Sequence, residues 1–241
     1  LTAAIRAAEA GATVTLLNAH PRIGLKILMS GGTRCNVTHR EVEARDFSGG
    51  SRPFVARILR AFTPKQTREW FASLGVELKL EETGKYFPTT DDAQTVLDAL
   101  LRAIERADVR VRSGARVVRL EHGAPERASG HAAPHWRLGV ETVRHSAALG
   151  SDVSAVGETE WPLPAAAATE WVEADAVILA AGGLSFPRTG SDGTGYALAA
   201  ALGHTIVPTV PALTPLTAED ALCKSAQGVT LPAELTLWVG G

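Results

Sequence analysis

The sequence predicts an α/β protein in which a parallel β-sheet is covered by helices. Helix-like and strand-like segments alternate along most of the chain, which is the pattern of that class. Residues 1–10 and 13–17 have the character of a helix followed by a short buried strand. Residues 175–180 (DAVILA) form a continuous apolar run, which is typical of a central parallel strand.

The overall composition argues against several classes of protein. The 241 residues suffice for one large domain or two small ones, and the net charge of -2 offers nothing to attract nucleic acid or an acidic membrane surface. The two cysteines cannot form a disulfide framework, and no apolar run is long enough to span a bilayer. We therefore expect a cytoplasmic protein with a small-molecule substrate and with neither nucleic acid nor membrane as a partner.

The first elements resemble the second half of a βαβ unit. Residues 1–10 are alanine-rich and amphipathic, and Gly11 stands where the C-terminus of a helix takes a residue with positive φ. The strand at 13–17 follows directly. Because residue 1 is Leu and neither a strand nor a glycine-rich turn precedes the helix, we expect a fragment that lacks both.

Two further helices begin at capping signals. Thr63, Pro64 and Gln66 form a capping box with proline in the first turn. The next helix opens at Asp91 and Gln94. Its apolar face consists of Val96, Leu97, Leu100, Leu101 and Ile104. Short strands are expected at residues 76–80, 109–112 and 115–121.

The second half of the chain is less regular. Residues 122–170 are biased toward Gly, Pro, His and Ala, and we expect an irregular β-hairpin insertion there, with a strand at 136–141. A helix at 195–202 and a strand at 205–207 follow, and proline spacing then indicates a different substructure. The predicted domains are residues 1–207 and 208–241.

The most informative segment is residues 30–39 (SGGTRCNVTH). It is too polar for a buried strand and too rich in glycine for a helix interior, so it predicts a loop shaped around a ligand. At Gly31 and Gly32, backbone N–H groups could approach a pyrophosphate or a flavin ring closely. The alternative is a surface loop with a tight glycine turn.

Side chains near these glycines carry suitable charge and hydrogen-bonding groups. Lys26 and Arg34 supply positive charge, and the planar guanidinium suits a phosphate or a carboxylate. Asn18 ends the first strand, where dinucleotide-binding folds place an acidic residue on the ribose; the alternative is a simple strand-end turn. Further hydrogen-bonding groups belong to Ser30, Asn36 and Thr38.

Cys35 has two interpretations. It is a redox partner or nucleophile, because a neighbouring arginine favours the thiolate, or it is a small buried apolar residue. Zinc fits poorly, since the chain has no CxxC motif and Cys223 is distant, so no metal site is expected.

A second glycine pair, Gly182 and Gly183, follows the apolar run at 175–180. It allows close approach of a cofactor, or it forms a strand-to-loop turn. Ligands of such sheets bind at the carboxyl ends of the strands, so both glycine-rich segments could line one crevice. Residues 190–193 (GSDG) are either a phosphate-type loop or a turn with a helix N-cap.

Several motifs together resemble a known family. Residues 24–38 (GLKILMSGGTRCNVT) are similar to the signature of the BaiN-like (YhiN-type) flavoproteins, which are NAD(P)/FAD-dependent oxidoreductases. The motifs follow the family's order over nearly the whole chain outside 122–170. The further matches are residues 181–187, 189–191 and 195–196, and more weakly 62–77 and 85–88.

The resemblance implies a glutathione-reductase-type, FAD-binding Rossmann-like domain, truncated at both ends, with an inserted β-rich domain starting near residue 211. It implies that Leu1 follows the family's glycine-rich phosphate turn. It places Asn18 at the adenosine ribose and the backbone of Val117 near adenine. The remaining implied cofactor contacts are Lys26, Ser30, Gly31, Gly32, Arg34, Cys35 and Asn36 along the pyrophosphate and isoalloxazine, and Ala181, Gly182 and Gly183 in a second turn.

The predicted function is therefore an FAD-binding oxidoreductase that uses NAD(P)H or a small organic substrate as electron donor. The sequence departs from the family pattern at Asn18, Leu25, Thr33 and Arg188, and the missing acidic group at position 18 weakens the ribose contact. This loss and the irregular 122–170 segment favour the alternative, a non-catalytic flavin- or nucleotide-binding module. The residues identify neither the substrate nor a general base.

Overall fold

The computed structural model describes residues 1–123, 136–144, 163–210, 234 and 236. The chain divides into two compact units, Leu1–Thr209 and Val210–Gly241. The second unit lies almost wholly outside the described residues, so the architecture below is that of the first.

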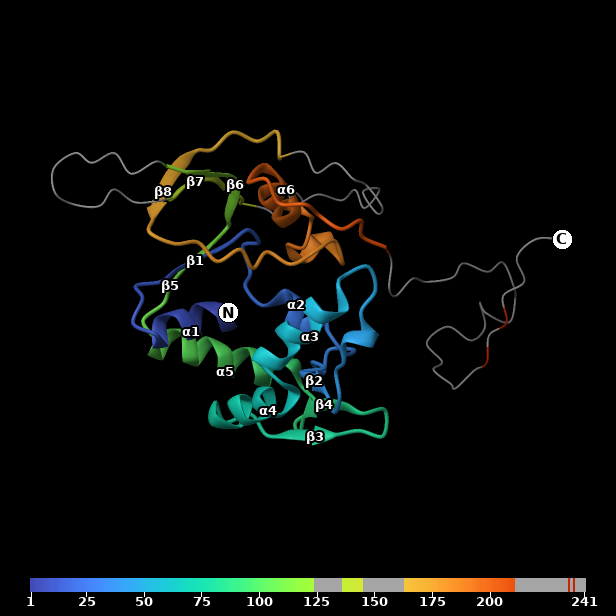
Figure 1. Ribbon diagram of the computed structural model, residues 1–241. Helices are drawn as coiled ribbons and strands as arrows, with labels where there is room; N and C mark the ends of the chain where they lie inside the picture. The colour runs from blue at the N-terminus through green and yellow to red at the C-terminus, as the bar shows by residue number, and fades with distance from the viewer. Residues whose placement is uncertain (124–135, 145–162, 211–233, 235, 237–241) are drawn as a thin grey trace, which may run out of the picture. The chain divides into compact units, whose positions relative to one another are not determined.

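Helices and strands alternate along the first unit (Figure 1). The helices are α1 (Thr2–Glu9), α2 (Leu25–Met29), α3 (Arg52–Ala61), α4 (Pro64–Ser73), α5 (Ala93–Arg106) and α6 (Thr194–Ala201). The strands are β1 (Thr15–Asn18), β2 (Thr38–His39), β3 (Leu78–Leu80), β4 (Lys85–Pro88), β5 (Arg110–Ser113), β6 (Ala115–His122), β7 (Trp136–Thr142) and β8 (Glu170–Ala174).

The strands form three small sheets. β1 and β5 pair in parallel, with Thr15 opposite Arg110 and Asn18 opposite Ser113. β2, β4 and β3 form one antiparallel sheet, and β6, β7 and β8 form another. The predicted α/β class with a parallel sheet is confirmed, and the antiparallel sheets add to it.

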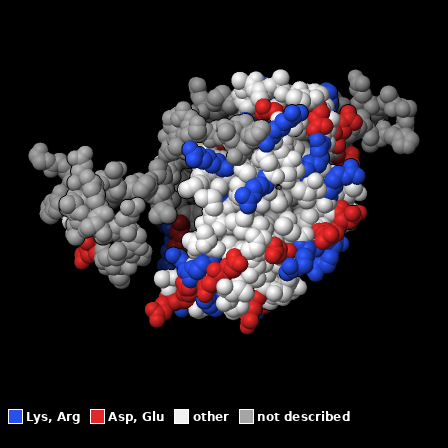
Figure 2. All heavy atoms as spheres, turned by 180° about the vertical axis from the view of Figure 1, so that it is seen from behind, with Lys and Arg blue, Asp and Glu red and all other residues white. Residues whose placement is uncertain are grey.

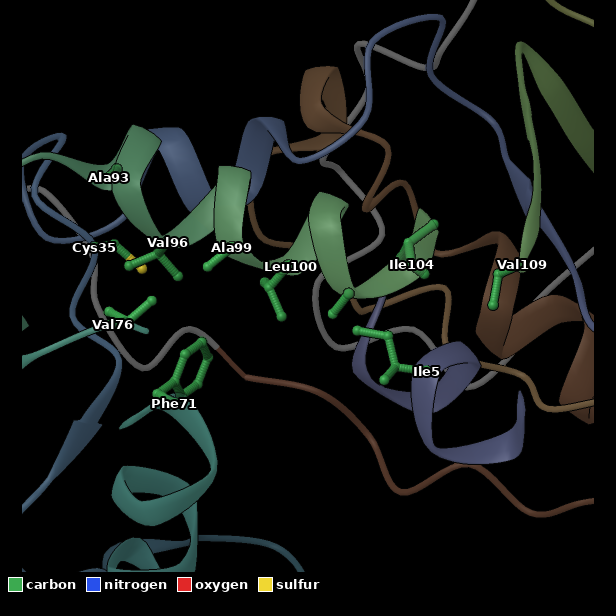
Figure 3. Close-up of a cluster of buried hydrophobic side chains, with 11 residues drawn as sticks. Ile5, Cys35, Phe71, Val76, Ala93, Val96, Ala99, Leu100, Ile104 and Val109 are labelled. Atoms are coloured by element: carbon green, nitrogen blue, oxygen red, sulfur yellow. The ribbon is translucent and has the colours of Figure 1, made fainter. Parts of the chain in front are cut away.

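The larger core is built around α5 (Figure 3). Its apolar residues recur every three or four positions, so they share one face of the helix. That face, with Val96 and Leu100 1% and 3% exposed, packs against Ile5 of α1 and Phe71 of α4. The periodicity in the sequence therefore predicted the central helix correctly.

Local capping signals set the starts of α4 and α5. The Thr63 hydroxyl accepts the Gln66 N–H at 3.3 Å, and Gln66 Oε1 accepts the Thr63 N–H at 2.8 Å, which confirms the capping box. α5 begins slightly later than expected: its N-cap is Asp92, whose carboxylate accepts the Gln94 N–H at 2.9 Å.

Residues 175–180 do not form the expected strand. They have no regular secondary structure, and Ile178 and Leu179 are 63% and 43% exposed. A strand needs a neighbour for its hydrogen bonds. The described parallel sheet contains β1 and β5 alone, and neither pairs with this segment. The strand expected at 205–207 is absent for the same reason.

Part of the region 122–170 is well formed. β7 pairs with β6 and β8 in register, and the β6–β7 ladder has an irregularity between Val117 and Arg119. Leu138 and Val140 of β7 are buried in a second, smaller core. The rest of the expected irregular insertion, residues 124–135 and 145–162, lies outside the described residues.

The surface is mixed in charge. On the face shown in Figure 2, acidic and basic side chains lie interspersed, in keeping with the small net charge. Within the described ranges, no helix has both the length and the apolar character that a membrane crossing requires.

Cys35 belongs to the larger core. Its side chain is 6% exposed and lies beside Val96 of α5 (Figure 3). Burial raises the pKa of this thiol above its usual value near 9, and a hydrogen bond with Ser30 offsets only part of that rise. The geometry supports the interpretation of Cys35 as a small buried apolar residue.

Replacing the N-cap of α4 should destabilise the protein. In Thr63→Ala the Gln66 N–H loses its acceptor, which lowers the free energy of unfolding by about 1 kcal/mol. Urea unfolding followed by circular dichroism measures this change. The matched control is Ser51→Ala at the N-cap of α3, where the side chain makes no capping hydrogen bond. Equal losses in both variants would contradict the role of the cap.

Burial of Cys35 should make stability depend on pH. The folded-state pKa is raised, so the folded chain holds the thiol proton more tightly than the unfolded chain. The free energy of unfolding should therefore fall as pH rises through about 9, and Cys35→Ala should lack this component. In a Cys223→Ser background, iodoacetamide should label the folded protein far more slowly than the urea-unfolded chain at pH 8. Equal labelling rates would contradict the burial.

Candidate functional site

A cavity of about 370 Å³ lies among α1, α2 with its following loop, α4 and α5. Val96 and Leu100 of α5 form part of its wall, so the cavity shares this wall with the larger core. Aromatic rings of Phe62 and Trp70 line another part. The polar residues that line it are Thr2, Lys26, Ser30, Asn36 and Thr67.

The loop after α2 is shaped by left-handed backbone. Gly31 and Gly32 have φ values of 58° and 65°, and the non-glycine residues Thr33 and Cys35 have 69° and 63°. A Cβ atom at Gly31 would lie 2.7 Å from the backbone nitrogen of Asn36, so this position requires glycine. Holding non-glycine residues in this region costs about 1–2 kcal/mol each. The tight turn brings Ser30, Cys35 and Asn36 to the cavity.

Positive charge at the cavity comes from Lys26. It is the charged side chain among the described lining residues, and burial lowers the pKa of its ammonium group. The hydroxyls of Thr2 and Ser30 and the amide of Asn36 also line the cavity and can donate hydrogen bonds. Together these groups make a place suited to an anion.

Lys26 also connects the cavity to a distant segment. Its ammonium group donates a hydrogen bond to the backbone oxygen of Ser185. Ser185 follows the second glycine pair, Gly182 and Gly183, by two residues. The bond thus links α2, which precedes the first glycine-rich segment, to the residues that follow the second, although the second segment does not line the cavity.

Arg34 is directed away from the cavity. Its Nη1 lies 2.5 Å from Glu81 Oε1 and 3.4 Å from Asp91 Oδ1, and the guanidinium lies 4.0 Å from the centre of the Phe87 ring. Lys79 binds the same Asp91 carboxylate, and this bond, with Arg34 as the weaker influence, lowers the pKa of Asp91. These contacts tie the loop to the turn between β3 and β4, to β4 itself and to the turn before α5.

The other predicted contact residues lie outside the cavity lining. The amide nitrogen of Asn18 donates to the backbone oxygen of His20, which is the arrangement of a strand-end turn. Val117 is half-buried in β6. Gly182 and Gly183 pack closely on Ser191 and Tyr196, and Ala181 adjoins Gly195. No group of three or more His, Cys, Asp or Glu suited to a metal occurs in the described parts of the chain.

The structure brings together four of the predicted contact residues, Lys26, Ser30, Cys35 and Asn36, in one cavity. Sequence reasoning missed the opposite wall. Thr67, Trp70 and Phe71 are spaced three and four residues apart, so they share one face of α4. This helical spacing, a few residues after Phe62, was the pattern in the sequence that could have indicated the wall.

Comparisons with known proteins agree with the resemblance of the motifs. The model of the HI0933-like protein Rossmann domain matches residues 1–135. A 3-dehydro-bile acid delta(4,6)-reductase of Clostridium scindens is 33% identical over an alignment of 242 positions that covers 100% of this chain and 50% of that protein. A ribosomal RNA dihydrouridine synthase of Haemophilus influenzae is 26% identical over 100% of this chain and 52% of its own length.

A ribosomal RNA dihydrouridine synthase of Escherichia coli is 27% identical over 95% of this chain and 49% of that protein. The chain thus spans about half the length of the curated relatives it matches. Because the family's Rossmann-domain model covers more than half of the chain, the protein belongs to the HI0933-like family of flavoproteins, as its motifs predicted.

Proposed function

We propose that the protein is an FAD-dependent oxidoreductase and that the cavity beside α1 holds part of the FAD. The observation that carries this proposal is the set of groups around the cavity. Lys26 offers positive charge, while Ser30 and Asn36 offer hydrogen bonds beside a loop that requires glycine at position 31. This is a donor set that suits a dinucleotide with an anionic pyrophosphate and polar ring edges.

The residues divide the work of binding. Lys26 takes the pyrophosphate through a charged hydrogen bond. Ser30 and Asn36 bind polar edges of the cofactor. Gly31 and Gly32 allow the backbone of the loop to approach the cofactor closely. Cys35 closes the loop against the core, and the apolar wall with Trp70 excludes water.

The remaining predicted contacts act at the margin of the site. Arg34 holds the binding loop in place through Glu81 and Asp91. In the proposed complex, Asn18 lies at the ribose, the backbone of Val117 at adenine, and the turn at 181–183 on a further part of the cofactor. The two domains proposed are the FAD-binding residues 1–207 and the start of a β-rich domain at 208–241.

The names of the relatives suggest the reaction. A delta(4,6)-reductase of a 3-dehydro-bile acid and a dihydrouridine synthase both saturate a carbon–carbon double bond conjugated with a carbonyl group. Bound FAD supplies the two-electron chemistry that protein side chains lack. We therefore propose reduction of a conjugated double bond at the expense of NAD(P)H, in a cytoplasmic protein, with a small molecule as the preferred substrate class.

A non-catalytic flavin-binding module is the second candidate. It is favoured by Asn18, whose amide already binds the His20 oxygen and which lacks the charge of an acidic ribose ligand. The two candidates predict different behaviour toward reductants.

Reduction of the bound flavin tests the function. The protein expressed from its complete gene should be yellow and should lose absorbance near 450 nm when NADH or NADPH is added without oxygen. An α,β-unsaturated ketone should then restore the colour. A yellow protein inert to both reductants would support the binding module, and a protein that takes up no FAD would refute both candidates.

Lys26→Gln should weaken FAD binding about 10- to 100-fold, because a charged hydrogen bond to the cofactor is lost. Flavin fluorescence titration measures the dissociation constant. In the native protein, affinity should also fall as pH rises through the lowered pKa of Lys26, since only the ammonium form binds the pyrophosphate. The control is Lys65→Gln on α4, whose exposed side chain pairs with Glu69. A similar loss in both variants would contradict the assignment.

A further inference from the structure

Arg116 of β6 forms a nearly buried ion pair with a residue far along the chain. Its Nη2 lies 2.6 Å from Asp192 Oδ2 and 3.1 Å from Thr194 Oγ1, and the two paired side chains are 15% and 7% exposed. Glu141 of β7 also faces the guanidinium, at 3.9 Å from Nη1. A charge pair that is so well shielded holds its two segments in a defined geometry, because separating it would leave the buried Asp192 carboxylate without its charged partner.

Asp192 also binds the start of α6. Its second oxygen accepts the Thr194 N–H at 3.1 Å, so one carboxylate binds both β6 and the first turn of the helix. α6 lies against β6 (Figure 1). The turn before α6 is therefore positioned by the antiparallel sheet.

The same turn determines where the second glycine pair lies. The Gly183 oxygen accepts the Gly193 N–H at 3.2 Å. A Cβ atom at Gly182 would lie 2.8 Å from Ser191 Oγ, and one at Gly183 would lie 2.8 Å from the Tyr196 hydroxyl. The backbone hydrogen bond and this close packing tie the glycine pair to residues 191–196.

The segment with the glycine pair is held at its other end by the proposed FAD site, since Lys26 donates to the Ser185 oxygen. We propose that Arg116 is a positioning residue for that site. It acts through Asp192 to fix residues 182–185, and thereby fixes the ammonium group of Lys26 beside the cavity. This inference rests on the proposed function, because it assigns a consequence for FAD binding to a residue outside the cavity.

The test compares FAD binding with stability in the protein expressed from its complete gene. Arg116→Gln and Asp192→Asn should each weaken FAD binding about tenfold, within the range of coupling that contacting charges show. The double variant should be no worse than the single variants, because both remove the same interaction. Arg116→Lys keeps the charge without the planar fork, so its affinity should lie between those of the native protein and Arg116→Gln.

A spectroscopic readout separates positioning from general destabilisation. The visible circular dichroism of bound FAD should change in Arg116→Gln at temperatures where far-ultraviolet spectra show a folded chain. The control is Arg137→Gln in the same sheet, whose partner Glu121 is 3.4 Å away and whose side chain is 49% exposed. That variant should change the dissociation constant by less than about twofold, as expected for an exposed pair.

The possible outcomes distinguish the two proposals. A native protein that binds no FAD would refute the proposed function. Native binding with unchanged affinity and flavin spectrum in folded Arg116→Lys and Asp192→Asn would overturn the positioning role alone. If Arg116→Gln fails to fold, those two variants decide the question. Equal losses in Arg116→Gln and Arg137→Gln would also overturn it.

Discussion

Burial of the apolar face of α5 is the interaction on which the rest of the structure depends. α1, α4 and the loop after α2 each contribute a buried residue to it: Ile5, Phe71 and Cys35. Full burial of a large aliphatic or aromatic side chain contributes about 1.5–3 kcal/mol, so this face is a large part of the stabilisation. The same helix also forms a wall of the cavity through Val96 and Leu100. Any change in the packing of α5 therefore changes the candidate site as well.

Features of the fold that are encoded locally could be predicted from the sequence. α4 begins where Thr63 and Gln66 complete a capping box within four residues. α5 begins at Ala93, between the two residues, Asp91 and Gln94, that were expected to open it. A parallel strand is different, because its hydrogen bonds come from distant segments. Residues 175–180 have the composition of a strand, but no described strand pairs with them. The short helix α2 was missed because its five residues are too few to show a helical period.

The candidate site shows the same difference between features that are encoded locally and features that depend on distant segments. Lys26, Ser30, Cys35 and Asn36 are close in the sequence, and they lie together in one cavity. Arg34 belongs to the same motif, yet its carboxylate partners lie about fifty residues later, and no local pattern indicates them. The aromatic wall was missed for a related reason, since it belongs to a helix whose apolar residues equally fit an ordinary core.

The exposed run at 175–180 has a consequence for how the chain would be cut. Proteases prefer exposed segments without regular structure, and this one presents Ile178 and Leu179 to solvent. A single nick there would separate α6 covalently from everything before it. The two pieces would still be joined by the ion pair of Arg116 and by the bond from Lys26 to the Ser185 oxygen. Nicked protein would thus stay associated through these two contacts after the chain is cut.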